Sequence, residues 1–321
     1  MASTLPAAIN GPTLPAALGA ELASAADLAR LEKADATRRA YASDWRMFQS
    51  YCEERGAFAL PAAPETVAAF LAWEDGRNSK PSTIGRRVAS VLYAHKLAGL
   101  ASPTNDERVK AVMRGIRRKQ GVAPVKKAPA DSVTVLAMCA NVGTGLASLR
   151  DRALLLLGFS IAARRSELVA LDVADIVENE HGLMVRIRRS KTDQEGHGAT
   201  VAVPFGAIAC PVKALRAWLD AAGITNGPIF RPVRTGGSVA ATRLTGRSVA
   251  NVVKVHAKRL GLDPAAFAGH SLRAGFATSA ASRGANLFKI MDVTRHKSVD
   301  TLRGYVRDAE LFRDHAGKGM L

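Results

Sequence analysis

The chain is poor in the residues that build disulfide frameworks and metal centres. Its 321 residues include 3 cysteines, Cys52, Cys139 and Cys210, which lie far apart and form no CxxC pair. Neither a disulfide framework nor a structural zinc site is expected, and free thiols fit a cytoplasmic protein. No two histidines have HxxxH spacing, and GTGLAS at 143–148 lacks the Gly-Lys-Ser/Thr ending of a P-loop. We predict that the protein uses no metal, no ATP and no other cofactor.

Long apolar runs and an early positive charge are also missing. No Lys or Arg precedes Arg30, so the charged segment of a secretory signal is lacking. The longest apolar run, roughly 153–163, is too short to cross a bilayer. We therefore expect a soluble cytoplasmic protein without a membrane partner.

Acidic residues are scarce relative to basic ones. Asp and Glu number 28 against 45 Lys and Arg, which gives a formal net charge of +17 at pH 7. Such an excess indicates a polyanionic partner, with nucleic acid favoured over a membrane surface. For a DNA-binding protein this predicts association with the nucleoid.

The length and the local patterns predict two domains. Residues 1–22 are rich in Ala and Pro, repeat the pentapeptide TLPAA, and are expected to form a flexible arm. Helical spacing of apolar residues over 23–120 predicts an all-helical domain. Two prolines and two lysines within 121–130 are typical of a linker, which leaves 131–321 as the second domain.

The second domain contains one recognisable hairpin among helical segments. Residues 183–188 alternate between apolar and other side chains, two glycines follow at 196 and 198, and valines recur at 201 and 203. This pattern predicts two antiparallel strands joined by a turn. The expected fold class is mainly α with a small β-sheet, that is, α+β.

A basic stripe is predicted at the end of the first domain. In 109–119 the apolar residues fall on one face of a helix, and Lys110, Arg114, Arg117 and Arg118 fall on another. These four, with Arg86 and Arg87 on an earlier helix, are candidates for contacts to DNA phosphates. A merely solvated basic face is the alternative.

Six residues of the second domain form an ordered set. They stand in AARRSEL at 162–168, SKT at 190–192, HSLR at 270–273 and HKSVDTLRGY at 296–305, and they are Arg164, Lys191, His270, Arg273, His296 and Tyr305. The set resembles the motif series of the tyrosine recombinase family, the phage-type DNA integrases and resolvases. The resemblance covers roughly residues 30–315 and includes the order of a helical domain, a basic linker and a larger second domain. Two positions depart from it, because Ala162 and Arg295 stand where many members have glycine.

The resemblance implies a DNA core-binding domain followed by a tyrosine-recombinase catalytic domain. It implies a site-specific DNA recombinase that cuts and rejoins strands through a 3′-phosphotyrosine and a Holliday junction, without metal or ATP. The implied partners are double-stranded DNA with a specific target, expected to be an inverted repeat, and three further copies of the chain in a homotetramer. Accessory DNA-bending or directionality factors are further possible partners.

The chemistry of strand cleavage accounts for these residue types. Two guanidinium groups can hold a phosphate bidentately, and the resemblance assigns this clamp to Arg164 and Arg273, with His296 as a further donor. A tyrosine phenol is protonated at neutral pH and needs a base, whereas the departing 5′-oxygen needs an acid. These roles are assigned to His270 and Lys191, and a supporting role to Glu167, one turn after Arg164.

Each of these residues also has a simpler reading when it is taken alone. Tyr305 could be a core ring, His270 and Arg273 a surface pair, and Lys191 a solvated turn residue.

Two alternative functions of the whole protein remain open. A type IB topoisomerase would use a comparable set as a monomer without a defined site, and a DNA-binding module that has lost catalysis would keep the basic surface alone.

Overall fold

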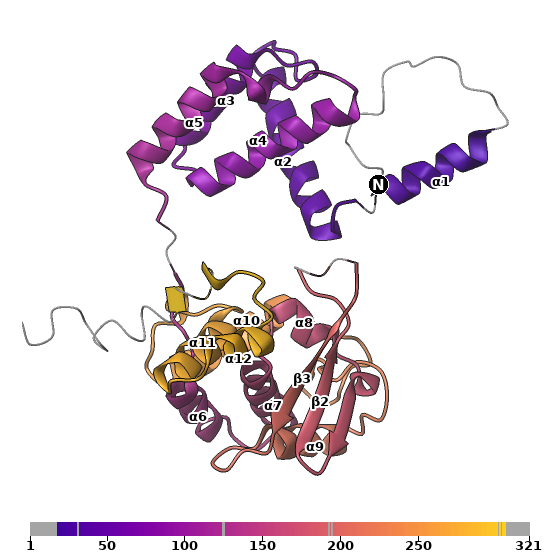
Figure 1. The fold of residues 1–321 in the computed structure, drawn as a ribbon, viewed down its shortest axis with the longest axis vertical. Helices are drawn as coiled ribbons and strands as arrows, with labels where there is room; N and C mark the ends of the chain where they lie inside the picture. Colours follow the sequence, from indigo (N-terminus) through magenta and orange to yellow (C-terminus); the bar gives the residue numbers. More distant parts are fainter. Residues whose placement is uncertain are drawn as a thin grey trace, which may run out of the picture. The chain divides into compact units, whose positions relative to one another are not determined.

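The computed structural model describes residues 18–30, 32–123, 126–191, 193, 195–300, 302, 304 and 305. The chain divides into two compact units, 1–125 and 126–321, each with its own apolar core (Figure 1). The predicted arm, 1–22, lies mostly outside the described residues. No helix in the described ranges is long and apolar enough to cross a membrane.

The first unit is a set of helices around an aromatic core. Its elements are α1 (Gly19–Arg30), α2 (Asp35–Glu53), α3 (Pro64–Gly76), α4 (Pro81–Leu97), the short η2 (Pro103–Asn105) and α5 (Glu107–Gln120). Both α3 and α4 begin with proline, whose fixed φ suits the first helical position. The rings of Phe48 and Phe70 are fully buried and meet edge to face at 5.1 Å.

The second unit combines helices with one small sheet. Its elements in order are α6 (Ser132–Ala140), α7 (Leu146–Ser160), α8 (Arg165–Ala170), η3 (Val173–Asp175), β1 (Ile176–Asn179), β2 (Gly182–Ile187), β3 (Ala199–Pro204), α9 (Pro211–Ala221), α10 (Gly246–Arg259), η4 (Pro264–Ala266), α11 (Ser271–Ser282) and α12 (Leu287–Thr294). The expected fold class, mainly α with a small sheet, is confirmed.

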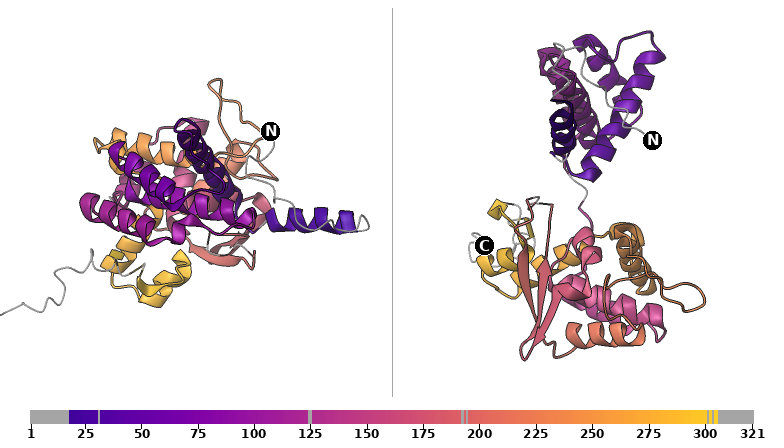
Figure 2. Two further views of the ribbon diagram at one scale, coloured as in Figure 1. Left: turned by 90° about the horizontal axis from the view of Figure 1, so that it is seen from above. Right: turned by 90° about the vertical axis from the view of Figure 1, so that its right-hand side faces the viewer.

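The sheet is antiparallel in the order β1-β2-β3, and one of its faces is packed. Leu183 pairs with Val203 and Val185 with Val201, and all four side chains are buried, whereas Met184 and Arg186 between them are exposed. The alternation that predicted the hairpin is therefore the alternation between core and solvent. Figure 2 shows the sheet at one side of this unit, with helices behind it.

The segment 126–130, at the start of the second unit, packs against α11. Ala128 donates its N–H to the carbonyl of Ala266, and Ala130 donates to that of Ser271. Ala130 is fully buried, and a Cβ on Gly275 of α11 would overlap its carbonyl oxygen. The second half of the segment predicted as a linker, 121–130, thus has fixed hydrogen-bond partners.

Candidate active site

The turn between α7 and α8 positions the first arginine of the predicted set. Ala162 adopts the left-handed conformation, with φ of 46°, although it is not a glycine. Arg164 then forms the N-cap of α8, and its backbone N–H donates to Glu167 Oε2 at 2.9 Å. The Arg164 side chain returns to the same carboxylate, with Nη1 2.7 Å from Oε1. Glu167 therefore fixes both the backbone and the guanidinium of Arg164, and its supporting role in catalysis stays a prediction.

Glu167 also binds a second guanidinium. Arg295 Nη2 donates to Glu167 Oε2 at 2.7 Å, and the carboxylate is almost completely buried between the two arginines. Burial opposes ionisation of Glu167, but the charge of Arg295 and the hydrogen bonds from Arg164 outweigh it and lower the pKa of this carboxyl. The carboxylate is thus ionised at neutral pH and holds two cations.

Arg273 lies beside this cluster with part of its guanidinium unpaired. It belongs to the first turn of α11, is 4% exposed, and donates from Nη1 to the carbonyl of Ala162 at 2.9 Å. Its Nη2 is buried and has no hydrogen-bond partner among the described residues. Burial, and then the charges of Arg164 and Arg295, lower the pKa of Arg273 to about 10. A buried cation with a free donor is a position that an anion would stabilise.

His296 and Tyr305 are brought together on the same side of the unit. Their rings stack at a centroid distance of 6.3 Å with an interplanar angle of 28°. Tyr305 also packs against a small apolar cluster that includes Ala277 of α11 and Ile290 of α12. It is therefore half-buried, with neither the sealed position of a core ring nor the freedom of a surface side chain.

Hydrogen bonding defines the proton position on His296. The hydroxyl of Thr294 donates to the carbonyl of Ile290 at 2.7 Å, so its oxygen accepts from His296 Nδ1 at 2.8 Å. Burial, and then the charges of Arg273, Arg164 and Arg295, lower the pKa of His296 to about 4. The ring is neutral at pH 7 in the free protein, so its Nε2 carries no proton there, and the predicted donor role of His296 requires the ring to take up a proton when an anion binds.

His270 lies close enough to Arg273 and Lys191 for their charges to act on it. His270 is the N-cap of α11 and keeps an exposed edge. Desolvation, and then the charges of Arg165, Arg273, Arg164 and Lys191, lower its pKa. Because Lys191 contributes to this shift, the exposed lysine of the β2–β3 turn lies within electrostatic reach of His270. All six predicted residues therefore belong to one region of the second unit.

Asp193 organises the turn that carries Lys191. Its carboxylate accepts backbone N–H groups from Gly196, His197 and Gly198 at 3.2, 3.1 and 2.8 Å. These bonds lower the pKa of Asp193, led by the bond from Gly198. Nothing in the local sequence singles out this aspartate, since an acid in a polar turn is ordinarily solvated.

Arg165 is a second residue that sequence reasoning missed. Its side chain lies in a slot made by two glycines, and a Cβ on Gly269 would be 2.8 Å from its Cδ, while one on Gly246 would be 3.4 Å from its Cγ. Of the neighbouring charges that lower the pKa of His270, that of Arg165 has the largest effect. The paired glycines were visible in the sequence, but only the fold places them against one arginine.

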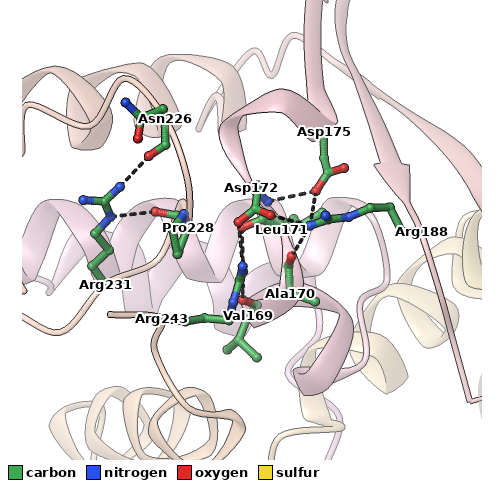
Figure 3. A network of polar contacts seen from close by, with 10 residues as sticks. All are labelled: Val169, Ala170, Leu171, Asp172, Asp175, Arg188, Asn226, Pro228, Arg231 and Arg243. Atoms are coloured by element: carbon green, nitrogen blue, oxygen red, sulfur yellow. Dashed lines mark hydrogen bonds and ion pairs between the residues drawn. The ribbon is translucent and has the colours of Figure 1, made fainter. Parts of the chain in front are cut away.

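The C-terminal end of α8 is held by arginines from two other segments, shown in Figure 3. Arg188, just after β2, donates to the carbonyl of Ala170 at 2.8 Å and to Asp172 Oδ2 at 2.6 Å. Arg243 donates to the carbonyl of Val169 and to Asp172 Oδ1, both at 2.6 Å. Asp172 thus connects the helix that follows Arg164 to the strand that leads to Lys191.

The six predicted phosphate contacts of the first unit lie on α5 and α4, and they differ in how far protein carboxylates already pair with them. Lys110, Arg114, Arg117 and Arg118 are exposed on α5, while Val109, Met113 and Ile116 face the core. Arg86 binds buried Asp44 through two hydrogen bonds of 2.6 and 3.0 Å but keeps 49% of its side chain exposed. Arg87 differs, because its side chain is 16% exposed and ion-paired with buried Glu74. Arg87 therefore stabilises the helical unit through this ion pair, and its contact to a DNA phosphate stays a prediction.

Comparisons with known proteins agree with this geometry. The phage integrase family matches residues 128–311. An integrase/recombinase xerD homolog of Selenomonas ruminantium is 41% identical over 295 residues, covering 89% of this chain and 86% of its own. Recombinase cre of Escherichia phage P1 is 24% identical over 293 residues, with 83% and 84% covered.

Solved structures give the same fold. The XerH site-specific recombinase, bound to a palindromic difH substrate in a post-cleavage complex, has a TM-score of 0.62 at 16% identity, with 85% of this chain and 77% of that chain covered. A lambda integrase dimer bound to a COC′ core site has a TM-score of 0.59 at 16% identity, with 95% and 84% covered.

The family model and the relatives place this chain among enzymes that exchange DNA strands. The chain belongs to the phage integrase family as a tyrosine recombinase, and it is a site-specific recombinase or integrase. Within the described ranges, no three His, Cys, Asp or Glu side chains gather in a way that could hold a metal ion.

Proposed function

We propose that the protein cuts and rejoins duplex DNA at a specific site through a covalent 3′-phosphotyrosine at Tyr305. The observation that carries the proposal is the surplus of buried positive charge. Glu167 supplies one negative charge against the guanidinium groups of Arg164, Arg273 and Arg295, and Arg273 Nη2 has no partner among the described residues. A phosphodiester would supply the missing anion.

In the proposed cleavage step one phosphorus–oxygen bond forms as another breaks, and each proton that moves has an acceptor. Tyr305 Oη attacks the phosphorus, its proton passes to His270, and the bond from phosphorus to the 5′-oxygen breaks. The leaving 5′-oxygen takes a proton from Lys191, which leaves a free 5′-hydroxyl and a 3′-phosphotyrosine. Because one phosphate diester replaces another, a 5′-hydroxyl from a second duplex can reverse the step without ATP.

The electrostatic environment favours this step. Lowering of the His270 pKa keeps its imidazole neutral at pH 7, which is the form that can accept the tyrosine proton. The attack increases the charge on the non-bridging oxygens, and charge-assisted hydrogen bonds to them contribute about 1.5–3 kcal/mol each. Loss of Arg164 or Arg273 would remove several such bonds in the transition state and slow cleavage by orders of magnitude.

The proposal extends to the partners of the reaction. We propose a double-stranded target built as an inverted repeat, a homotetramer on DNA and a Holliday junction between two rounds of strand exchange. The related XerH protein was solved with a palindromic substrate, which supports the inverted repeat. The exposed cations of α5 would contact phosphates. Accessory DNA-bending or directionality factors and association with the nucleoid belong to the same proposal.

A nicked duplex tests the covalent step. Duplexes that the protein binds are first selected from a library of randomised inverted repeats. Each is then nicked near its centre so that the cleaved end diffuses away, and is incubated with the protein in EDTA. We expect an adduct on the 3′ end that resists SDS, and Tyr305→Phe should bind the same duplex but give no adduct.

Tyr93→Phe is the matched control, because Tyr93 lies on α4 in the other unit. This variant should form the adduct at the wild-type rate. An adduct that persists in Tyr305→Phe, or that maps to another residue, refutes the assignment. Failure of the wild-type protein to form any adduct on duplexes that it binds specifically refutes the covalent mechanism.

A further inference from the structure

Arg295 occupies a backbone position that suits glycine. It follows α12 in the left-handed conformation, with φ of 55°, and its N–H donates to the carbonyl of Met291 at 2.6 Å. A side chain in this conformation carries a cost that glycine lacks. A non-glycine residue here therefore requires a compensating interaction.

The Arg295 side chain supplies several such interactions. Nη1 donates to the carbonyls of Ile161 at 3.0 Å and Val293 at 2.7 Å, and Nη2 donates to Glu167 at 2.7 Å. The guanidinium thus extends from the end of α12 to the turn between α7 and α8. It joins the residue next to His296 to the turn that carries Arg164.

The same turn receives a second guanidinium at the adjacent residue. Arg295 binds the carbonyl of Ile161, and Arg273 binds the carbonyl of Ala162. Ala162 is itself in the left-handed conformation, so the turn has a cost of its own. Two charge-assisted hydrogen bonds to consecutive carbonyls hold it in place.

Arg295 is poorly placed to bind the phosphate directly. Its side chain is 10% exposed, both terminal nitrogens already donate to protein oxygens, and only the buried Nε lacks a partner among the described residues. Arg273, by contrast, has a terminal nitrogen without a partner among the described residues. Protein oxygens therefore occupy the terminal nitrogens of Arg295, whereas Arg273 keeps one terminal nitrogen that can bind an anion.

We propose that Arg295 is a positioning residue for strand cleavage. It fixes the α7–α8 turn, and with it Arg164, relative to His296 before DNA binds. This inference rests on the proposed function for its consequence in catalysis, but the positioning itself is a property of the free protein. A displacement of about 1 Å in a catalytic group can slow a reaction about 100-fold.

Arg295→Gly is the first test, because glycine accepts the left-handed backbone while removing the guanidinium. Single-turnover cleavage of a nicked duplex selected by binding should fall about 100-fold, whereas the Kd for that duplex should stay within about threefold of wild type. Guanidinium ion at low millimolar concentration should restore part of the rate, since it can occupy the vacated site between Glu167 and Ile161. Arg295→Lys, which keeps the charge but lacks the planar guanidinium and its several donors, should give an intermediate rate.

Hydrogen exchange of the DNA-free protein separates positioning from general destabilisation. In Arg295→Gly, exchange should accelerate in peptides that cover 159–168 and stay unchanged in peptides from α9 and α10. Added guanidinium ion should slow the exchange again. This measurement decides the positioning even if the wild-type protein forms no adduct and the proposed function fails.

Two results would overturn the inference. One is a cleavage rate of Arg295→Gly within about threefold of wild type together with unchanged exchange in 159–168. The other is faster exchange throughout the second unit, for Arg295→Lys as well as Arg295→Gly, with DNA binding and cleavage lost in parallel. The second result would make Arg295 a residue of general stability only.

Discussion

At the scale of single residues, Arg273 is a buried guanidinium that the rest of the described chain leaves partly unpaired. Its guanidinium is 4% exposed, one nitrogen lacks a hydrogen-bond partner within the described residues, and burial with two neighbouring cations lowers its pKa to about 10. An unsatisfied buried charge destabilises a folded protein. The compensation comes only when an anion enters the site.

Replacement of Arg273 by an apolar side chain of similar length should therefore separate stability from function. We expect Arg273→Met to unfold at the same temperature as wild type or higher in the absence of DNA, because removing a buried, partly unpaired charge beside two other cations outweighs the loss of its hydrogen bond to the Ala162 carbonyl, which is worth about 1.5–3 kcal/mol. The same variant should form no covalent adduct. Thermal unfolding and the nicked-duplex assay measure the two effects, and a large drop in Tm would contradict the argument.

The lowered pKa of His296 predicts how the stability of the folded protein changes in acid. The folded protein holds this ring neutral down to about pH 4, whereas in the unfolded chain it titrates near 6.5. Between these values the unfolded chain binds a proton that the folded chain does not, so the ring's contribution to stability is complete above 6.5 and decreases as pH falls. Denaturant unfolding of the DNA-free protein between pH 7 and 4 should show a shallower loss of stability for His296→Gln than for wild type.

His181 gives the control for this titration. Its side chain is almost fully exposed, next to Glu180 in the β1–β2 turn. His181→Gln should follow the wild-type stability curve over the same pH range. Parallel curves for wild type and His296→Gln would show that the burial of His296 does not contribute to acid sensitivity.

At the scale of elements, α8 is fixed at both ends by guanidinium groups. Arg164 and Arg295 meet Glu167 in its first turn, and Arg188 and Arg243 bind its last carbonyls (Figure 3). A helix this short has little stability of its own. Its orientation, and hence that of Arg164, is decided by the partners that bind its ends.

The contact between α11 and segment 126–130 depends on one glycine. A Cβ on Gly275 would overlap the carbonyl of Ala130, which is backbone that cannot move without breaking its bond to Ser271. We expect Gly275→Ala to destabilise the second unit by more than about 2 kcal/mol, a size typical of strain in a packed core. Gly85→Ala on α4 is the control, since no atom lies within 4 Å of its added Cβ, and it should be neutral or stabilising by up to about 1 kcal/mol. Denaturant unfolding measures both, and equal effects would contradict the packing argument.

At the scale of the whole molecule, the net charge of +17 predicts binding that depends strongly on salt. Lys110, Arg117 and Arg118 on α5 give this property a location on the first unit, whereas the exposed Arg114 of the same helix is paired with Glu107. Arg108 lies on the same helix but is paired with Asp106 at 2.8 Å and with Glu65, so its charge is locally balanced. The two kinds of arginine allow a comparison within one helix.

We expect each of Arg117→Ala and Arg118→Ala to reduce the slope of log K against log salt concentration by about 0.9, the value for one lost phosphate contact on duplex DNA. Arg108→Ala should change the slope by much less. Fluorescence anisotropy with one duplex at several salt concentrations provides the measurement. An unchanged slope in both Arg117→Ala and Arg118→Ala would place the phosphate contacts elsewhere.

The hairpin could be predicted because it depends on a local pattern, since alternation at 183–188 follows directly from the period of a strand. The six ordered residues were singled out by their resemblance to the motif series of a family, and their catalytic roles stay predictions. Arg87 could not be judged in this way, because its position on a helix gives no sign that Glu74 is buried beside it. Arg165, Arg295 and Asp193 were missed for the same reason, since their partners are distant in sequence or are backbone groups.

By itself, the sequence determined the net charge and the helical and strand periodicities, because these depend on side-chain chemistry and short-range order. Only the tertiary structure decided which cations are already neutralised and which remain free for DNA. Ala162 and Arg295 illustrate the difference, since their left-handed backbones are tolerated only where packed neighbours hold them. Pairing and burial are properties of groups that meet in space, and residues far apart along the chain meet only after it has folded.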